Sequence, residues 1–179
     1  MSMGGFNAAA LVGHTDQATV LLAAVKLLRA SVEQFNSPSL CFVSDLDWPS
    51  VEVQQNVFCT VSPSDGEFDQ AGIIGGANVQ VLEASTLQVN VFSRIQLDRI
   101  EHAPIAFLDR QRGLLPLKKS VLKALAGRQL YGDYPTNMIP LLTKWLTPMH
   151  AKTGATKKEE DDFVFLSITF DAPFYWDLT

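Results

Sequence analysis

The end of the chain carries the pattern that most restricts its fold. From Phe163 to Asp171 apolar and polar residues alternate, with Leu166, Ile168 and Phe170 on one side of the pattern. A period of two in β-branched and aromatic residues is typical of a strand with one buried face. Because helical patterns precede this strand, it has to return to a sheet formed by earlier segments. We therefore expect one α+β domain that a C-terminal strand closes.

A strong helical pattern lies near the N-terminus. Apolar residues recur at intervals of three and four across residues 16–35, which predicts an amphipathic helix. Thr15 or Asp16 can cap its start, and Asn36-Ser37-Pro38 ends it. We expect this helix to bury one apolar stripe on the sheet.

Two later segments also have helical patterns. Residues 114–126 are predicted to form a helix, with Gly127 as the residue that follows its C-terminus. A shorter third helix is predicted at residues 138–146, with Pro140 still inside its first turn. The fold class expected is a mostly antiparallel β-sheet with an N-terminal helix and these two later helices packed on it.

Three earlier segments have strand patterns. Residues 40–43 form a short apolar run, and apolar residues hold one parity in residues 51–61 and 79–93, so the last two are predicted to pair as a hairpin. Residues 62–77 and 147–162 lack a regular pattern. They are expected to be long loops, which are usually functional or disordered in a compact domain.

Chain length, composition and net charge limit the class of protein. A chain of 179 residues predicts one domain, here residues 16–179, after a flexible N-terminal arm of residues 1–15. The low share of charged residues, 18%, favours oligomerisation weakly. A net charge of −5 argues against a nucleic-acid-binding surface.

The longest apolar stretch, residues 18–28, contains Lys26 and is too short to span a membrane. Cys41 and Cys59 are too few for a disulfide framework, so we expect them to be buried in a cytoplasmic protein.

No catalytic, cofactor or metal site is expected from the motifs. None of the three histidines stands at a metal-ligand spacing: His14, His102 and His150. Cys59 with His150 is the pair to consider as a nucleophile and base, but Cys59 alternates with core valines. The glycines of residues 72–76 do not match a phosphate-binding pattern. Asp45 and Asp47 have the character of turn residues.

The candidate interface residues are aromatic and basic. Phe174, Tyr175 and Trp176 follow Pro173, and aromatic residues are enriched at interfaces. A tail folded back over its own core is the alternative for these three. Two basic residues, Arg110 and Arg112, are expected either to form an interface ion pair or to have no specific role.

The order of elements resembles a protein family. An amphipathic N-terminal helix is followed by a strand start, a long strand, a helix and a closing strand: Trp48-Pro-Ser-Val-Glu-Val, Gln88-Val-Asn-Val-Phe-Ser, Leu117-Lys-Lys-Ser-Val-Leu-Lys-Ala-Leu-Ala-Gly and Phe165-Leu-Ser-Ile-Thr-Phe. Over residues 16–171 this layout resembles the tail terminator and tail-completion proteins of tailed bacteriophages, small α+β domains that form a ring on the tail tube. The family has no diagnostic motif, so it assigns no site residue.

The resemblance implies a structural virion protein without enzymatic activity or cofactor. It implies a homo-oligomer, a hexamer, that caps the tail, binds other tail and connector proteins and is assembled in the host cytoplasm. DNA passes through such a ring without specific binding. The chain is long for the family, with the extra length in the two loops, so terminator, neck and other connector positions stay open. The alternatives are a small enzyme or ligand-binding domain, and an adaptor that binds through residues 174–176.

Overall fold

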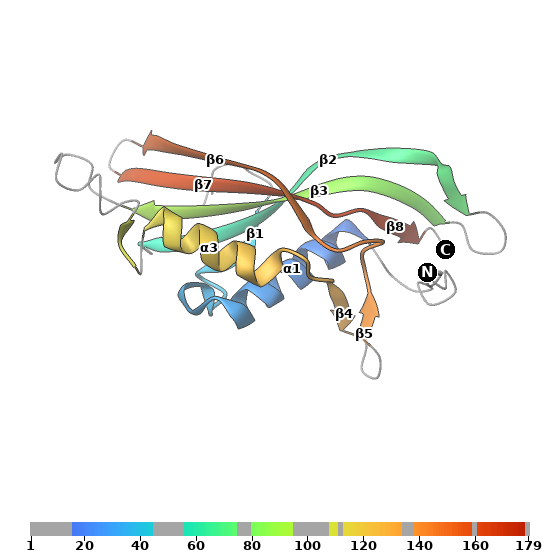
Figure 1. The fold of residues 1–179 in the computed structure, drawn as a ribbon, viewed down its shortest axis with the longest axis horizontal. Coiled ribbons are helices and arrows are strands. Elements are labelled where there is room, and N and C mark those ends of the chain that lie inside the picture. Colours follow the sequence, from blue (N-terminus) through green and yellow to red (C-terminus); the bar gives the residue numbers. More distant parts are fainter. Residues whose placement is uncertain are drawn as a thin grey trace.

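Two helices lie on one face of a six-stranded sheet (Figure 1). The structure is a computed structural model, and it describes residues 16–44, 56–74, 80–94, 108–110, 113–133, 138–158 and 161–177. The helices are α1 (Gln17–Ser31) and α3 (Leu114–Leu125), with a short 3-10 helix, η2 (Glu33–Phe35), after α1. The strands are β1 (Cys41–Val43), β2 (Val57–Ile74), β3 (Gln80–Arg94), β4 (Tyr131–Asp133), β5 (Met138–Pro140), β6 (Thr147–Lys158), β7 (Asp161–Asp171) and β8 (Phe174–Asp177).

The sheet is mostly antiparallel. Its strand order is β1-β2-β3-β7-β6, and only β1 pairs with its neighbour in parallel. β7 and β8 pair in succession with the same side of β3, so the chain from Asp161 to Asp177 runs along β3 with one interruption at Ala172 and Pro173. β4 and β5 form a separate two-stranded sheet. The predicted α+β class and the predicted β2–β3 hairpin pairing are confirmed.

Helix α1 begins where its sequence predicts and ends earlier than predicted. The side chain of Asp16 accepts a hydrogen bond from the Thr19 backbone N–H at 2.6 Å, which satisfies one of the free donors at a helix N-terminus. The α-helix ends at Ser31, and η2 continues the chain to Phe35, so the observed α-helix is shorter than the predicted one. After α3, Gly127 has a φ of 70°, where glycine is favoured, as predicted for that position.

The predicted third helix is wrong. Residues 138–140 form β5, which pairs with β4, and Leu142 bridges to Phe174. The Leu141 backbone N–H also donates to the Leu130 carbonyl at 2.8 Å. Segments distant in sequence therefore supply the backbone partners that a helix would have supplied locally, and of the two predicted later helices the structure contains α3.

The two predicted long loops are wrong as well. β2 continues through residues 62–74, and β6 occupies most of residues 147–162. Register shifts interrupt both strands, between Pro63 and Gly66, between Asp69 and Ile73, and between Pro148 and His150. Each shift breaks the period of two that a strand shows in its sequence, so the pattern is lost although the pairing continues.

The core lies between the sheet and the two helices. Leu166, Ile168 and Phe170 of β7 are buried there, as their alternation predicts. Cys41 and Cys59 are also buried, as predicted, and they stand directly opposite each other in the β1–β2 register with both thiols free. No helix in the described part of the chain is long and apolar enough to cross a membrane.

The sheet face away from the helices carries a second, smaller cluster. Phe58 and Phe92 stack with ring centroids 4.8 Å apart, and Phe42 and Phe165 pack against them. Next to this cluster lies a polar row across β2, β3 and β7, where Gln88 donates to both Asn90 and Ser167. This helix-free face is therefore aromatic near one end of the strands and polar beside it.

The predicted N-terminal arm, residues 1–15, lies outside the described residues. The described residues between 16 and 177 share one main core, to which α1, α3 and the strands β1, β2, β3, β7 and β8 contribute buried residues. The prediction of a single domain is not tested beyond that.

Candidate assembly surface

The two edges of the six-stranded sheet are open in the described part of the chain. At one edge, β6 pairs with β7 on its inner side, and no described strand pairs with its outer side. At the other edge, β1 covers β2 only as far as Val61. Beyond Val61, β2 pairs with β3 alone among the described strands. Unpaired strand edges offer rows of backbone N–H and C=O groups to another chain.

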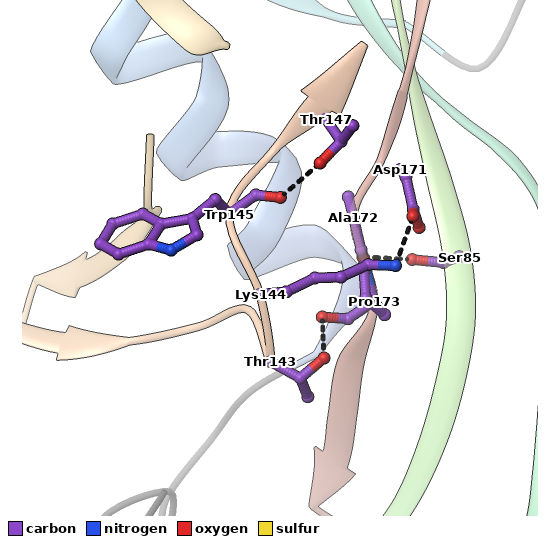
Figure 2. A network of polar contacts seen from close by, with 8 residues as sticks. All are labelled: Ser85, Thr143, Lys144, Trp145, Thr147, Asp171, Ala172 and Pro173. Atoms are coloured by element: carbon purple, nitrogen blue, oxygen red, sulfur yellow. Dashed lines mark hydrogen bonds and ion pairs between the residues drawn. The ribbon is translucent and has the colours of Figure 1, made fainter. Parts of the chain in front are cut away.

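The β6 edge is exposed on both of its faces. His150, Ala151, Lys152 and Thr153 are all exposed, although Ala151 and Thr153 lie in register with core residues of β7. The helices therefore do not cover β6 as they cover β7. Just before β6, Trp145 is 62% exposed, and its ring points away from the surrounding contacts (Figure 2).

The free part of β2 belongs to a hairpin arm. The β2–β3 hairpin continues past the helices (Figure 1), and Glu67, Phe68 and Asp69 are exposed on it, Phe68 to 65%. β8 pairs with residues 80–83 of β3 on the other side of the arm. The arm is thus supported along one side, and its β2 edge faces outward.

A group of polar contacts fixes the start of β6 to the break between β7 and β8 (Figure 2). The Ser85 hydroxyl donates to the Ala172 carbonyl at 2.7 Å, and the Ala172 N–H donates to the Ser85 carbonyl at 2.9 Å. The Thr143 N–H donates to the Pro173 carbonyl at 2.8 Å. Lys144 forms an ion pair with Asp171 at 2.5 Å. The chain that leads into β6 is therefore held against the strand next to it.

The candidate interface aromatics differ in their placement. Phe174 is fully buried in the main core. Its position agrees with the alternative expectation, in which the tail folds back over its own core. Tyr175 and Trp176 are half-buried, and Trp176 packs against the core with its ring 5.4 Å from that of Phe174. A role for these residues in an interface stays a prediction. Arg110 is exposed, and Arg112 lies outside the described residues.

The nucleophile and base considered from the sequence are far apart. Cys59 lies in β2 and His150 in β6, with β3 and β7 between them. At about 4.8 Å per strand this separation is about 14 Å. His150 instead shares a hydrogen bond with Thr169 at 3.1 Å, and it lies in a strand where a loop was expected. The other candidates, His14, His102, Asp45 and Asp47, lie outside the described residues.

The pKa of the Cys59 thiol is raised well above its usual value. Burial is the largest cause, and the hydrogen bond and charge interaction with Cys41 act in the same direction. A nucleophilic cysteine needs the opposite shift. The described residues also contain no group of three His, Cys, Asp or Glu side chains that could hold a metal ion.

The sequence did not point to either sheet edge, because both lie in segments predicted to be loops. One sequence signal could have indicated the β2 edge: Glu67 and Asp69 are two residues apart in a segment rich in charged and polar residues. Like charges at a period of two are compatible with one face of a strand.

The likeness of this chain to known proteins lies in structure and not in sequence. The sequence matches no protein-family model, and no curated protein matches it. A solved structure described as the virion of a native gene transfer agent (GTA) particle is similar to the chain, with 14% sequence identity and a TM-score of 0.45. The likeness covers 90% of this chain and 99% of that one. A TM-score of this size is too low to assign a shared fold or a role.

Proposed function

We propose that this chain is a structural protein of a tailed-phage virion, a tail terminator that forms a homo-oligomeric ring, caps the tail tube and joins it to the head connector. The observation that carries the proposal is the pair of open edges, β6 and the far part of β2, on one sheet. A ring needs two different patches on each copy, because each copy contacts a different surface of the next. Two unlike edges meet this requirement.

The rest of the chain is compatible with such a role. Six copies form the ring in this proposal, and other tail and connector proteins are its partners. The net charge of −5 suits a ring through which DNA passes, because a lumen that attracted phosphates would slow the DNA. No catalytic step is part of the proposal. Cys59 and His150, the nucleophile and base considered from the sequence, lie on strands separated by β3 and β7, and this supports a proposal without catalysis.

The order of elements along the chain supports the terminator position. A neck or another connector component would use the same edges, and it is the alternative within this class. The two positions differ in what the ring contacts, since a terminator binds the end of a tail tube.

Two measurements test the proposal. Sedimentation velocity over a concentration series is expected to show a discrete oligomer, and electron microscopy is expected to show rings that bind one end of isolated tail tubes. Rings that bind the portal vertex and leave tube ends bare would favour the neck position. A protein that stays monomeric at every concentration, with and without tail tubes, would contradict the proposal.

A further inference from the structure

The two open edges carry opposite charges. The charged residues of β6 are all basic: Lys152, Lys157 and Lys158. The charged residues of β2 are all acidic: Asp65, Glu67 and Asp69. A strand edge that carries one sign of charge is disfavoured from pairing with its own copy.

Lys152 of β6 and Glu67 of β2 lie on the same face of the sheet. Lys152 stands opposite Ser167 of β7, one residue out of phase with core residues Leu166 and Ile168, so it lies on the helix-free face. Glu67 stands opposite Ala84 of β3. Ala84 lies next to Glu83, which pairs with the core residue Phe174, so Glu67 lies on the helix-free face too.

This arrangement distinguishes the possible contacts between copies. Two β6 edges would bring lysines together, and two β2 edges would bring carboxylates together. Only β6 against β2 brings unlike charges together. Such a contact joins two different patches, so it is heterologous and extends to a ring or an open filament.

We infer that β6 of one copy pairs with the part of β2 beyond Val61 in a second copy, with Lys152 beside Glu67 on the helix-free face. The inference rests on the self-assembly in the proposed function and identifies its interface. Backbone hydrogen bonds between the strands supply most of the affinity. The charges select the partner edge, because interface charges contribute more to specificity than to affinity.

Charge reversal tests which edges meet. Lys152→Glu and Glu67→Lys are each expected to weaken self-association about five- to tenfold, and an equimolar mixture of the two is expected to restore it. In that mixture every contact between alternating copies joins unlike charges. Lys119→Glu on α3 and Glu33→Lys in η2 are matched controls at exposed positions, and they should assemble as the unchanged protein does. Thermal unfolding checks that each variant is folded.

Cross-linking gives a direct readout. Lys152→Cys and Glu67→Cys proteins, mixed under mild oxidation, are expected to form a covalent dimer that neither forms alone. A dimer from Lys152→Cys alone would overturn the inference in favour of a β6–β6 contact. An oligomer of the unchanged protein that is insensitive to both charge reversals and gives no mixed cross-link would overturn it while leaving the proposed ring intact. A monomeric unchanged protein would instead contradict the proposed function itself.

Discussion

The indole N–H of Trp176 donates a hydrogen bond to the carboxylate of Glu83. Glu83 is buried, although its side chain is polar, and it lies on the hairpin arm that carries the free part of β2. On its other side, it faces Gly66 of β2. One carboxylate thus connects β8 to both strands of the arm.

Gly66 leaves the space that Glu83 occupies. A Cβ at this position would lie 2.1 Å from the Glu83 Oε1 atom, so Gly66→Ala must displace a carboxylate that Trp176 holds. We expect a loss of about 1–3 kcal/mol in the free energy of unfolding, measured by urea denaturation. In a Glu83→Ala background the same change should cost much less. Equal costs in the two backgrounds would contradict this contact.

Phe174 and Tyr175 are adjacent and should behave differently. Phe174 is fully buried in the core, so Phe174→Ala is expected to cost about 3–5 kcal/mol of stability, measured by denaturant unfolding. Tyr175 is half-buried, so Tyr175→Ala should cost clearly less. A folded Tyr175→Ala protein that fails to assemble would place Tyr175 in an interface, and one that assembles normally would exclude it from that role.

The Ser85 hydroxyl holds the interruption between β7 and β8. Ser85→Ala removes the donor to the buried Ala172 carbonyl, and we expect it to cost about 1 kcal/mol. Ser39, which is exposed, provides the control: Ser39→Ala should change stability by less than about 0.5 kcal/mol. If chemical denaturation shows the same small change in unfolding free energy for both substitutions, the Ser85 hydroxyl does not contribute to stability.

Cys59 makes stability depend on pH in the alkaline range. Its pKa is raised in the fold, so the folded protein keeps a proton that the unfolded chain loses. This contribution is complete below the ordinary thiol pKa of about 8.5 and declines as the pH rises above it toward the folded value. Unfolding free energies measured between about pH 8 and pH 10 should fall less steeply for Cys59→Ala. If the unfolding free energies of the two proteins fall with pH at the same slope, the Cys59 thiol is not the cause of the pH dependence.

The sequence predicted the elements that bury one face. The alternation of Leu166, Ile168 and Phe170 predicted β7 correctly, because only one side of that strand faces the helices. β6 gave no such signal, since Ala151 and Lys152 are exposed on opposite faces. Its position depends on pairing with β7, and a contact between strands leaves no period in the sequence when neither face is buried.

The predicted helix at residues 138–146 failed for a related reason. Leu141, Leu142 and Leu146 have helical spacing and are buried, but their backbone partners lie in distant segments. Gly127 donates to the Leu146 carbonyl, and Leu142 bridges to Phe174. Tertiary pairing therefore overrides a weak local preference. The open edges were missed because both lie where strand patterns fail.

The position of β7 has a consequence for when a copy can join others. β7 follows β6 in the chain but lies between β6 and β3 in the sheet. Among the described strands β6 touches the sheet only through β7, so a growing chain without residues 161–171 has no scaffold on which to display β6. β6 therefore gains its place in the sheet only after β7 has been synthesised, so a chain that stops before β7 cannot present the basic edge.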